Sequence, residues 1–326
     1  MAAFDLPPDL KAALARKSEG LSRVDAAKRA GAISESYRGG GTSAPIRTER
    51  DALAYALARM PATYAAIAAS LHALREQRPD FVPATLLDVG AGPATASWAA
   101  AQTFESLTSF SAIDANTALC ALACDTVEDS RLASMRYVQN DVLAGLAAME
   151  GADLVIASYV INELGDADRD ALADLMWQKA RDTLLVIEPG TPAGYARILT
   201  LRTRLIAQGA HVIAPCPHDN ACPLTAPDWC HFSQRLSRSR AHKQLKGADV
   251  PFEDERFSYV ALSRLPLMLN TARVLAQPTL NKVAVSAKLC TKAGLSLVSV
   301  PRRDKPAYAA ARRWDWGDAV PDKAAE

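Results

Sequence analysis

Long apolar runs are missing from this sequence. A membrane-spanning helix needs about 20 consecutive apolar residues, and no run approaches that length, so we expect no membrane span. Residues 1–11 also lack the apolar segment behind a basic start that marks a secretory signal. Both absences favour a cytoplasmic protein.

The sequence also has little net charge and few cysteines or aromatic side chains. Lys and Arg total 37 against 36 Asp and Glu, so net charge predicts no partner, and affinity for nucleic acid would require local patches. Six cysteines in 326 residues are too few for a disulfide framework. In a reducing compartment, clustered cysteines more often bind metal.

The first 80 residues are expected to form a helical region, and residues 81–210 an α/β core. Between residues 51 and 75 apolar side chains recur at helical spacing. Short apolar runs and helical segments then alternate, which predicts a doubly wound, mostly parallel sheet. We expect strands over 86–89, 110–113, 136–139, 153–157 and 183–187, and helices over 95–103, 117–126, 168–181 and 195–208.

The regular alternation stops after residue 210. Residues 211–265 hold a loop rich in proline and cysteine and then a basic stretch, which we interpret as a metal-binding insertion. Later apolar runs predict further strands, and we expect residues 266–300 to return to the core sheet. Residues 301–326 are interpreted as a basic tail.

A glycine-rich turn follows the first expected strand. Gly90 permits a tight turn, and Gly92 lets the backbone approach a ligand. Asp114 and Asp141 end the second and third expected strands, so they share the carboxyl edge of the sheet, where α/β folds bind ligands. Asp114 suits ribose hydroxyls and Asp141 an adenine amino group. The alternative is a tight turn with no ligand.

The turn differs from the dinucleotide fingerprint G-x-G-x-x-G, because Thr95 occupies the place of the third glycine. The pattern D-x-G-x-G resembles motif I of class I methyltransferases, which use S-adenosylmethionine (SAM), although Ala94 stands where many members have glycine. No general base stands out, so we predict no catalytic residue; methyl transfer can proceed largely through positioning. The predicted SAM-binding residues are Asp88, Gly90, Gly92, Asp114 and Asp141.

Three cysteines lie close together after the core. Cys216, Cys222 and Cys230 fall within 15 residues, and neighbouring prolines exclude a helix or central strand. A loop wrapped around a metal fits this pattern, since thiolates bind zinc and iron–sulfur clusters. Cys290, at the end of an expected strand, is the best candidate for a fourth ligand. The alternative is a set of incidental thiols.

Zinc is the alternative to an iron–sulfur cluster as the bound metal. The spacing is not the C-x-x-C of zinc ribbons, but His218 and His231 lie close enough in sequence for a mixed zinc site. The other two cysteines, Cys120 and Cys124, are four residues apart on an expected helix. We interpret them as buried core residues.

Five cations follow the cysteine loop with no acid among them, and Trp229 and Phe232 precede them. Cations with aromatic neighbours are typical of a surface that contacts RNA phosphates and stacks bases. A solvated helix face is the alternative. The predicted RNA-binding residues are Arg235, Arg238, Arg240, Lys243 and Lys246. A second patch, or a loose tail, is formed by Arg302, Arg303, Lys305, Arg312 and Arg313.

Several longer segments of the sequence resemble one particular protein family. They are Leu86-Leu-Asp-Val-Gly-Ala-Gly-Pro93, Ser158-Tyr-Val-Ile-Asn-Glu-Leu164, Glu188-Pro-Gly-Thr-Pro192, the Cys-Pro-His-Asp run through Trp229-Cys-His-Phe232, Phe257-Ser-Tyr-Val-Ala-Leu-Ser-Arg264 and Ala311-Arg-Arg-Trp-Asp-Trp-Gly317. Over about residues 50–317 the chain resembles the mitochondrial small-ribosomal-subunit assembly methyltransferase-like family, in its bacterial form. The cysteine–proline region is the most specific part.

The resemblance implies a class I, Rossmann-like methyltransferase fold and association with the small ribosomal subunit or 16S-type rRNA. It also implies a [4Fe–4S] cluster on Cys216, Cys222, Cys230 and Cys290. The leading hypothesis is a SAM-dependent methyltransferase that acts on or binds this rRNA in ribosome assembly or translation. Two alternatives stay open: a non-enzymatic assembly factor with the same fold, and a zinc-containing small-molecule methyltransferase.

Overall fold

The computed structural model describes residues 4–39, 41–238, 240–246, 249–267 and 270–322. As expected, the N-terminal region is helical, with α1 (Pro8–Lys17), α2 (Arg23–Arg38) and α3 (Glu49–Gln77). Thr48 and Asp51 form a capping box at the start of α3. Most of α3 is buried, so its alanine-rich surface packs closely on its neighbours.

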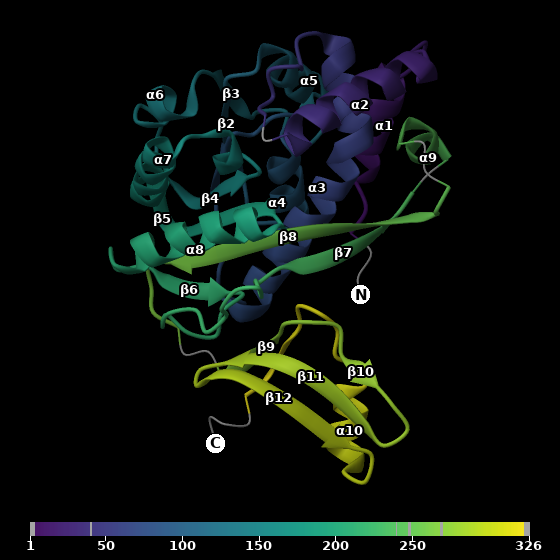
Figure 1. Cartoon of the computed structure of the whole chain (residues 1–326). Helices are drawn as coiled ribbons and strands as arrows, with labels where there is room; N and C mark the ends of the chain where they lie inside the picture. Colours follow the sequence, from purple (N-terminus) through teal and green to yellow (C-terminus); the bar gives the residue numbers. More distant parts are fainter. Residues whose placement is uncertain (1–3, 40, 239, 247–248, 268–269, 323–326) are drawn as a thin grey trace.

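The predicted doubly wound sheet is present, with strand order β3-β2-β1-β4-β5-β8-β6 and β7 paired to β8 (Figure 1). Strands β1 to β5 run parallel, whereas β8 is antiparallel to β5, β6 and β7. This order, with one antiparallel strand inserted beside β5, is that of a class I, Rossmann-like methyltransferase fold. The strands are β1 (Thr85–Val89), β2 (Ser109–Asp114), β3 (Arg136–Gln139), β4 (Ala152–Ser158), β5 (Ala180–Pro189), β6 (His211–Ala214), β7 (Phe232–Ser237) and β8 (Phe252–Ser263).

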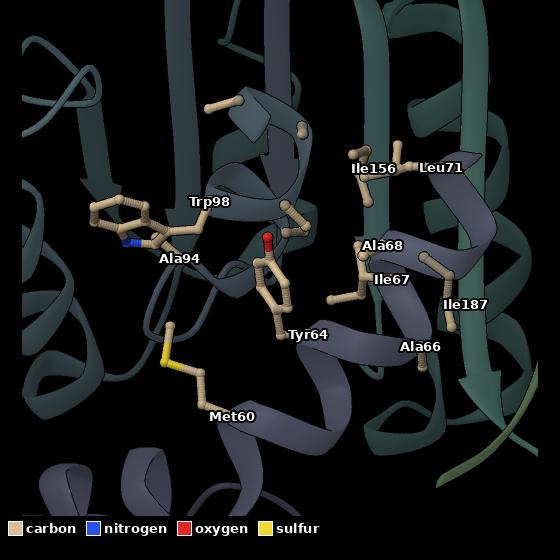
Figure 2. Packing of buried hydrophobic residues seen from close by; sticks show 14 of the residues in the cluster. Met60, Tyr64, Ala66, Ile67, Ala68, Leu71, Ala94, Trp98, Ile156 and Ile187 are labelled. Atoms are coloured by element: carbon tan, nitrogen blue, oxygen red, sulfur yellow. The ribbon is translucent and has the colours of Figure 1, made fainter. Parts of the chain in front are cut away.

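Both faces of this sheet are covered by helices. Leu86 and Ile156 point into a core shared with α3 and α4, whereas Leu87 and Val155 point into a core shared with α7 and α8. Figure 2 shows part of the first core, with side chains of α3 close to Trp98 and Ile187. The covering helices are α4 (Thr95–Thr103), α5 (Thr117–Val127), α6 (Val142–Leu146), η1 (Ile161–Glu163), α7 (Asp166–Lys179) and α8 (Pro192–Ile206).

The prediction that residues 266–300 return to the core sheet is wrong. The returning strand is β8, which fills the place beside β5, and the later strands pair with one another in a second, antiparallel sheet with its own small core around Val274, Leu289 and Val320. This sheet lies below the first in Figure 1. Its elements are β9 (Thr271–Val274), β10 (Thr279–Leu280), β11 (Ala284–Thr291), β12 (Gly294–Pro301), α10 (Lys305–Ala311) and β13 (Ala319–Pro321).

Residues 301–322 are therefore not a loose tail. Helix α10 packs against β11 and β12, and β13 pairs with β9. Among the described residues, no helix combines the length and apolar character needed to cross a membrane.

Candidate functional site

A cavity of about 1090 Å³ lies at the carboxyl edge of the first sheet. The glycine-rich loop after β1, Asp114 at the end of β2 and Asp141 after β3 line one side of it, and residues of α2 and α3 line another. Pockets for one small ligand are typically about 300–1,000 Å³. The cavity therefore has room for a cofactor and part of a second molecule.

The loop after β1 has the conformation that its glycines permit. Gly90 and Gly92 have φ of 66° and 52°, in the left-handed region. A Cβ on Gly90 would lie 2.3 Å from Cγ2 of Val160, so no larger residue fits there without a shift. Ala94 also has a positive φ, 61°, which explains why related turns favour glycine at this place. The loop carbonyl of Gly92 accepts a 2.6 Å hydrogen bond from the hydroxyl of Tyr137.

Asp114 and Asp141 lie where the sequence predicted, on the cavity wall. The carboxylate of Asp114 accepts hydrogen bonds from the backbone N–H of Gly92 (2.9 Å) and of Asn116 (2.8 Å), and burial raises its pKa. Asp141 caps α6, and its Oδ1 accepts from two backbone N–H groups of that helix. Each carboxylate keeps free lone pairs that can accept from a ligand.

Asp88 requires a correction, because it does not line the cavity. Its side chain is fully buried beneath the loop, where Oδ2 accepts from the backbone N–H and the hydroxyl of Ser97 at 2.9 and 2.8 Å. Its other oxygen has no hydrogen-bond partner. Asp88 thus fixes the start of α4 and supports the loop indirectly.

Replacing Asp88 with asparagine is expected to flatten the dependence of stability on pH. Burial raises the pKa of Asp88 from 3.8 to about 7, so the native state binds this proton more tightly and the free energy of unfolding falls as pH rises through that interval. The slope from one such proton is at most about 1.4 kcal/mol per pH unit. Asparagine carries no titrating proton and still accepts from Ser97.

Urea unfolding of wild type and Asp88→Asn at about pH 5 and about pH 8 measures this slope. Asp129→Asn, at an exposed acid, is the matched control and should keep the wild-type slope. An unchanged slope in Asp88→Asn would show that Asp88 is ionised in the folded protein throughout the range.

The far side of the cavity includes Arg59 and Tyr159, which the sequence did not mark as functional residues. Glu255 of β8 accepts a hydrogen bond from Arg59 at 3.2 Å and one from the hydroxyl of Tyr159 at 3.3 Å. Tyr159 has a φ of 57°, which is uncommon outside glycine and is found at functional sites. The Oδ1 atom of Asn162 is buried without a hydrogen-bond partner. Arg59, Tyr159 and Asn162 all line the cavity.

Helix α8 begins at the cavity rim and carries a buried ion pair. Thr191 caps the helix and lines the cavity. Glu188, at the end of β5, is fully buried, and its Oε2 lies 2.6 Å from Nε of Arg197. Burial raises the pKa of Glu188 to about 7, although Arg197 opposes this rise. Arg197 also faces the cavity.

The four cysteines predicted as metal ligands come together in space. Cys216 follows β6, Cys222 lies in the next loop, Cys230 precedes β7, and Cys290 lies in β11 of the second sheet. The pKa of Cys230 is raised well above its ordinary value by burial and by the three other thiols. The site thus joins the cysteine loop to the second sheet.

Hydrogen bonds reach two of these sulfur atoms. The hydroxyl of Tyr195, on α8, lies 3.2 Å from Sγ of Cys222, and Nε2 of His218 lies 3.7 Å from Sγ of Cys290. Arg202, also on α8, donates to the backbone carbonyl of His218 at 2.7 Å. The cysteine loop is therefore held by the same helix that borders the cavity.

The described residues contain no group of three or more His, Cys, Asp or Glu side chains spaced to hold a single metal ion. Four thiolates around one zinc ion would stand about 3.8 Å apart, given a Zn–S distance near 2.3 Å. A four-iron cluster is larger and holds its ligands further apart. Four cysteine thiolates are the usual donor set for such a cluster, so the residues fit one chemically.

The remaining two cysteines depart from expectation. Cys120 is partly buried on α5, but Cys124 is exposed. The prediction that both belong to the core is therefore wrong, because the helix turns Cys124 toward solvent.

The basic stretch is part strand and part helix, β7 followed by α9 (Arg240–Lys246). Antiparallel pairing places acids of β8 opposite its cations. Arg235 makes two bonds to Asp254, at 2.7 and 2.8 Å, while Arg238 and Lys246 both contact Glu253. Lys243 is half-buried, and the side chain of Arg240 lies outside the described residues. Three of the five predicted RNA contacts are thus already paired.

Residues 49–321 match the sequence profile of the family described as mitochondrial small ribosomal subunit Rsm22. The chain belongs to this family. The match includes the glycine loop, the four cysteines and the second sheet, but not α1 and α2. The predicted family resemblance is confirmed.

Curated proteins similar to this chain are mitochondrial. The human mitochondrial ribosome assembly protein METTL17 is 27% identical over 300 residues, covering 84% of this chain and 63% of the relative. An Rsm22-cox11 tandem protein of Schizosaccharomyces pombe is 25% identical over 333 residues, covering 84% and 43%. The chain therefore spans less than two thirds of these proteins.

Solved structures of methyltransferases are less similar to this chain in sequence than these relatives are. Magnesium protoporphyrin IX methyltransferase from Synechocystis, with SAM bound, is 11% identical with a TM-score of 0.40, covering 67% of this chain and 84% of that one. The N-methyltransferase NodS from Bradyrhizobium japonicum is 14% identical with a TM-score of 0.39, covering 60% and 84%.

Proposed function

We propose that this protein binds SAM in the cavity and acts with 16S-type rRNA in assembly of the small ribosomal subunit, as a cytoplasmic, methyltransferase-type protein. The observation that carries the proposal is the cavity at the carboxyl edge of a class I methyltransferase sheet, lined by Gly90, Gly92, Asp114 and Asp141. Membership of the Rsm22 family supports the ribosomal part.

The cavity divides by chemistry into two halves. The glycine loop and Asp114 suit the amino acid and ribose of SAM, because the loop backbone is open and the carboxylate can accept from hydroxyls. Tyr159, Arg59 and Asn162 face the other half, where a methyl acceptor would lie. The unpartnered Oδ1 of Asn162 suits an N–H or O–H donor of that acceptor.

Calorimetric titration of SAM into wild type and Asp114→Ala tests the cofactor site. Hydrogen bonds to a charged group contribute about 1.5–3 kcal/mol, so Asp114→Ala should bind SAM roughly 10- to 100-fold more weakly. Asp129→Ala, at an exposed acid that does not line the cavity, should bind as wild type. If wild type itself does not bind SAM, the cofactor proposal fails.

A non-enzymatic assembly factor is the second candidate. It is favoured by the carboxylates around the cavity, each of which is engaged structurally: Glu163, for example, accepts from the backbone N–H of Ser43 at 3.0 Å. A map of rRNA methylation in cells carrying Asp114→Ala separates the two. Loss of one methyl mark supports the enzyme, and an unchanged map with defective subunit assembly supports the factor.

We also propose that Cys216, Cys222, Cys230 and Cys290 hold a [4Fe–4S] cluster. Their proximity supports this, because the thiols of Cys216, Cys222 and Cys290 all act together with burial to raise the pKa of Cys230. When bound, the cluster would link the cysteine loop to β11. Zinc is the alternative occupant, and metal analysis distinguishes them.

A further inference from the structure

The predicted RNA-binding stretch and the C-terminal cations differ in how their charges are neutralised. Arg235, Arg238 and Lys246 are each paired with an acid of β8. Arg302, Arg303, Lys305, Arg312 and Arg313, here called the α10 cations, are all exposed. In the part of the chain that the structure describes, none of these five has a carboxylate within ion-pair distance.

The fold gathers the α10 cations on one end of the second sheet. Arg302 and Arg303 follow β12 directly, and Lys305 begins α10. Lys305 and Arg312 are seven residues apart on continuous helical backbone, so they share a helix face. The backbone N–H of Arg302 donates to the carbonyl of Val283 at 2.7 Å, which brings the exposed Lys282 beside the group.

The only acid between residues 302 and 313 is Asp304, and it is already engaged, because its Oδ1 caps α10 by accepting from the N–H of Ala307 at 3.2 Å. The span from Lys305 to Arg312 is about 10 Å along the helix. That length matches about three nucleotides of a stacked strand. Tyr308 lies on the same helix, with Arg312 6.0 Å from its ring centre, and offers a face for stacking.

We propose that the α10 cations form the surface through which this protein contacts the phosphates of single-stranded rRNA, in place of the β7–α9 stretch. The inference rests on the proposed function in that the partner is rRNA. Unpaired exposed cations release counterions from RNA on binding, whereas cations already paired with acids lose those partners first. Packing of α10 on β11 and β12 holds the group in place without rRNA.

The test measures fluorescence anisotropy of a fluorescein-labelled, single-stranded 16S-type rRNA fragment over a range of salt. The variant combines Arg302→Gln, Arg303→Gln, Arg312→Gln and Arg313→Gln. Removing four phosphate contacts should lower the slope of log K against log salt by about 3 and weaken binding roughly 100-fold at physiological salt. Arg235→Gln should leave both unchanged, and circular dichroism confirms that each variant is folded.

Each outcome bears on a different claim. If wild type binds the fragment and the fourfold variant keeps its slope and affinity, the proposal for the α10 cations is wrong. If the variant binds free rRNA normally but no longer binds the assembled small subunit, the surface contacts an acidic protein instead, which also overturns the proposal. If wild type does not bind rRNA, the proposed function fails at its RNA partner.

Discussion

Replacing Arg197 with alanine is expected to lower the free energy of unfolding by about 3–5 kcal/mol at neutral pH, because breaking a buried ion pair leaves an uncompensated charge. Its partner Glu188 is fully buried, and one of its oxygens has no hydrogen bond even with Arg197 present. The pKa of Glu188 is already raised to about 7 by burial. Without Arg197 the carboxyl group must take up a proton to stay inside.

The loss of stability caused by Arg197→Ala should therefore depend on pH. Below about pH 5 Glu188 is protonated in the native protein, so removing Arg197 costs less there than at about pH 8, where the wild-type carboxylate is charged. Urea unfolding at the two pH values measures both losses. A double-mutant cycle with Glu188→Gln isolates the pair, since the amide removes the charge and keeps the shape.

Arg204→Ala is the matched control, because Arg204 lies on the same helix and pairs with acids at the surface. It should change stability little at either pH. Equal losses for Arg197→Ala and Arg204→Ala, or a loss at Arg197 that does not vary with pH, would show that the Arg197–Glu188 pair does not stabilise the fold.

The glycine loop could be predicted from sequence because its requirement is local. Gly90 and Gly92 both have positive φ, and Gly90 also lies too close to Val160 for a larger residue; residue type alone signals such positions. Asp88 was misplaced because a strand-end position does not tell which way its side chain points. In the structure it turns under the loop to Ser97, while Asp114 faces the cavity.

Features that depend on distant pairing could not be predicted. The acids that neutralise Arg235 and Lys246 lie on β8. The register of β7 on β8 places Asp254 opposite Arg235, and the position of α9 brings Lys246 to Glu253. Arg59 reaches the cavity from a long helix with nothing in its sequence to mark it. The second sheet was missed for a similar reason: an apolar alternating run shows that a strand exists, but not which sheet it joins.

Replacing Cys290 with serine is expected to abolish metal binding by the cysteine site. Wild-type protein purified without oxygen should contain about four irons and four acid-labile sulfides per chain, and Cys290→Ser should lose most of both. Binding free energy at such sites is also folding free energy. The variant should therefore melt at lower temperature and be cut faster by protease between Cys216 and Cys230.

Cys124→Ser is the matched control, because Cys124 is an exposed thiol on α5. This variant should keep the wild-type metal content, melting temperature and protease resistance.

The position of protease cleavage is informative because the cysteine loop has further anchors. Two examples are the bond from Tyr195 to Cys222 and that from Trp229 Nε1 to the carbonyl of Gly190. These two anchors lie on the first-sheet side. On the other side the loop is held by the pairing of Asp228 with Lys288 and by the bond from Arg273 to the carbonyl of Pro215. Cys290 brings the thiol from the second sheet, so its loss should loosen the loop on that side without freeing it. One zinc and no sulfide in wild type would replace the cluster with the zinc alternative, and wild type without metal would remove the four-cysteine site from the proposed function.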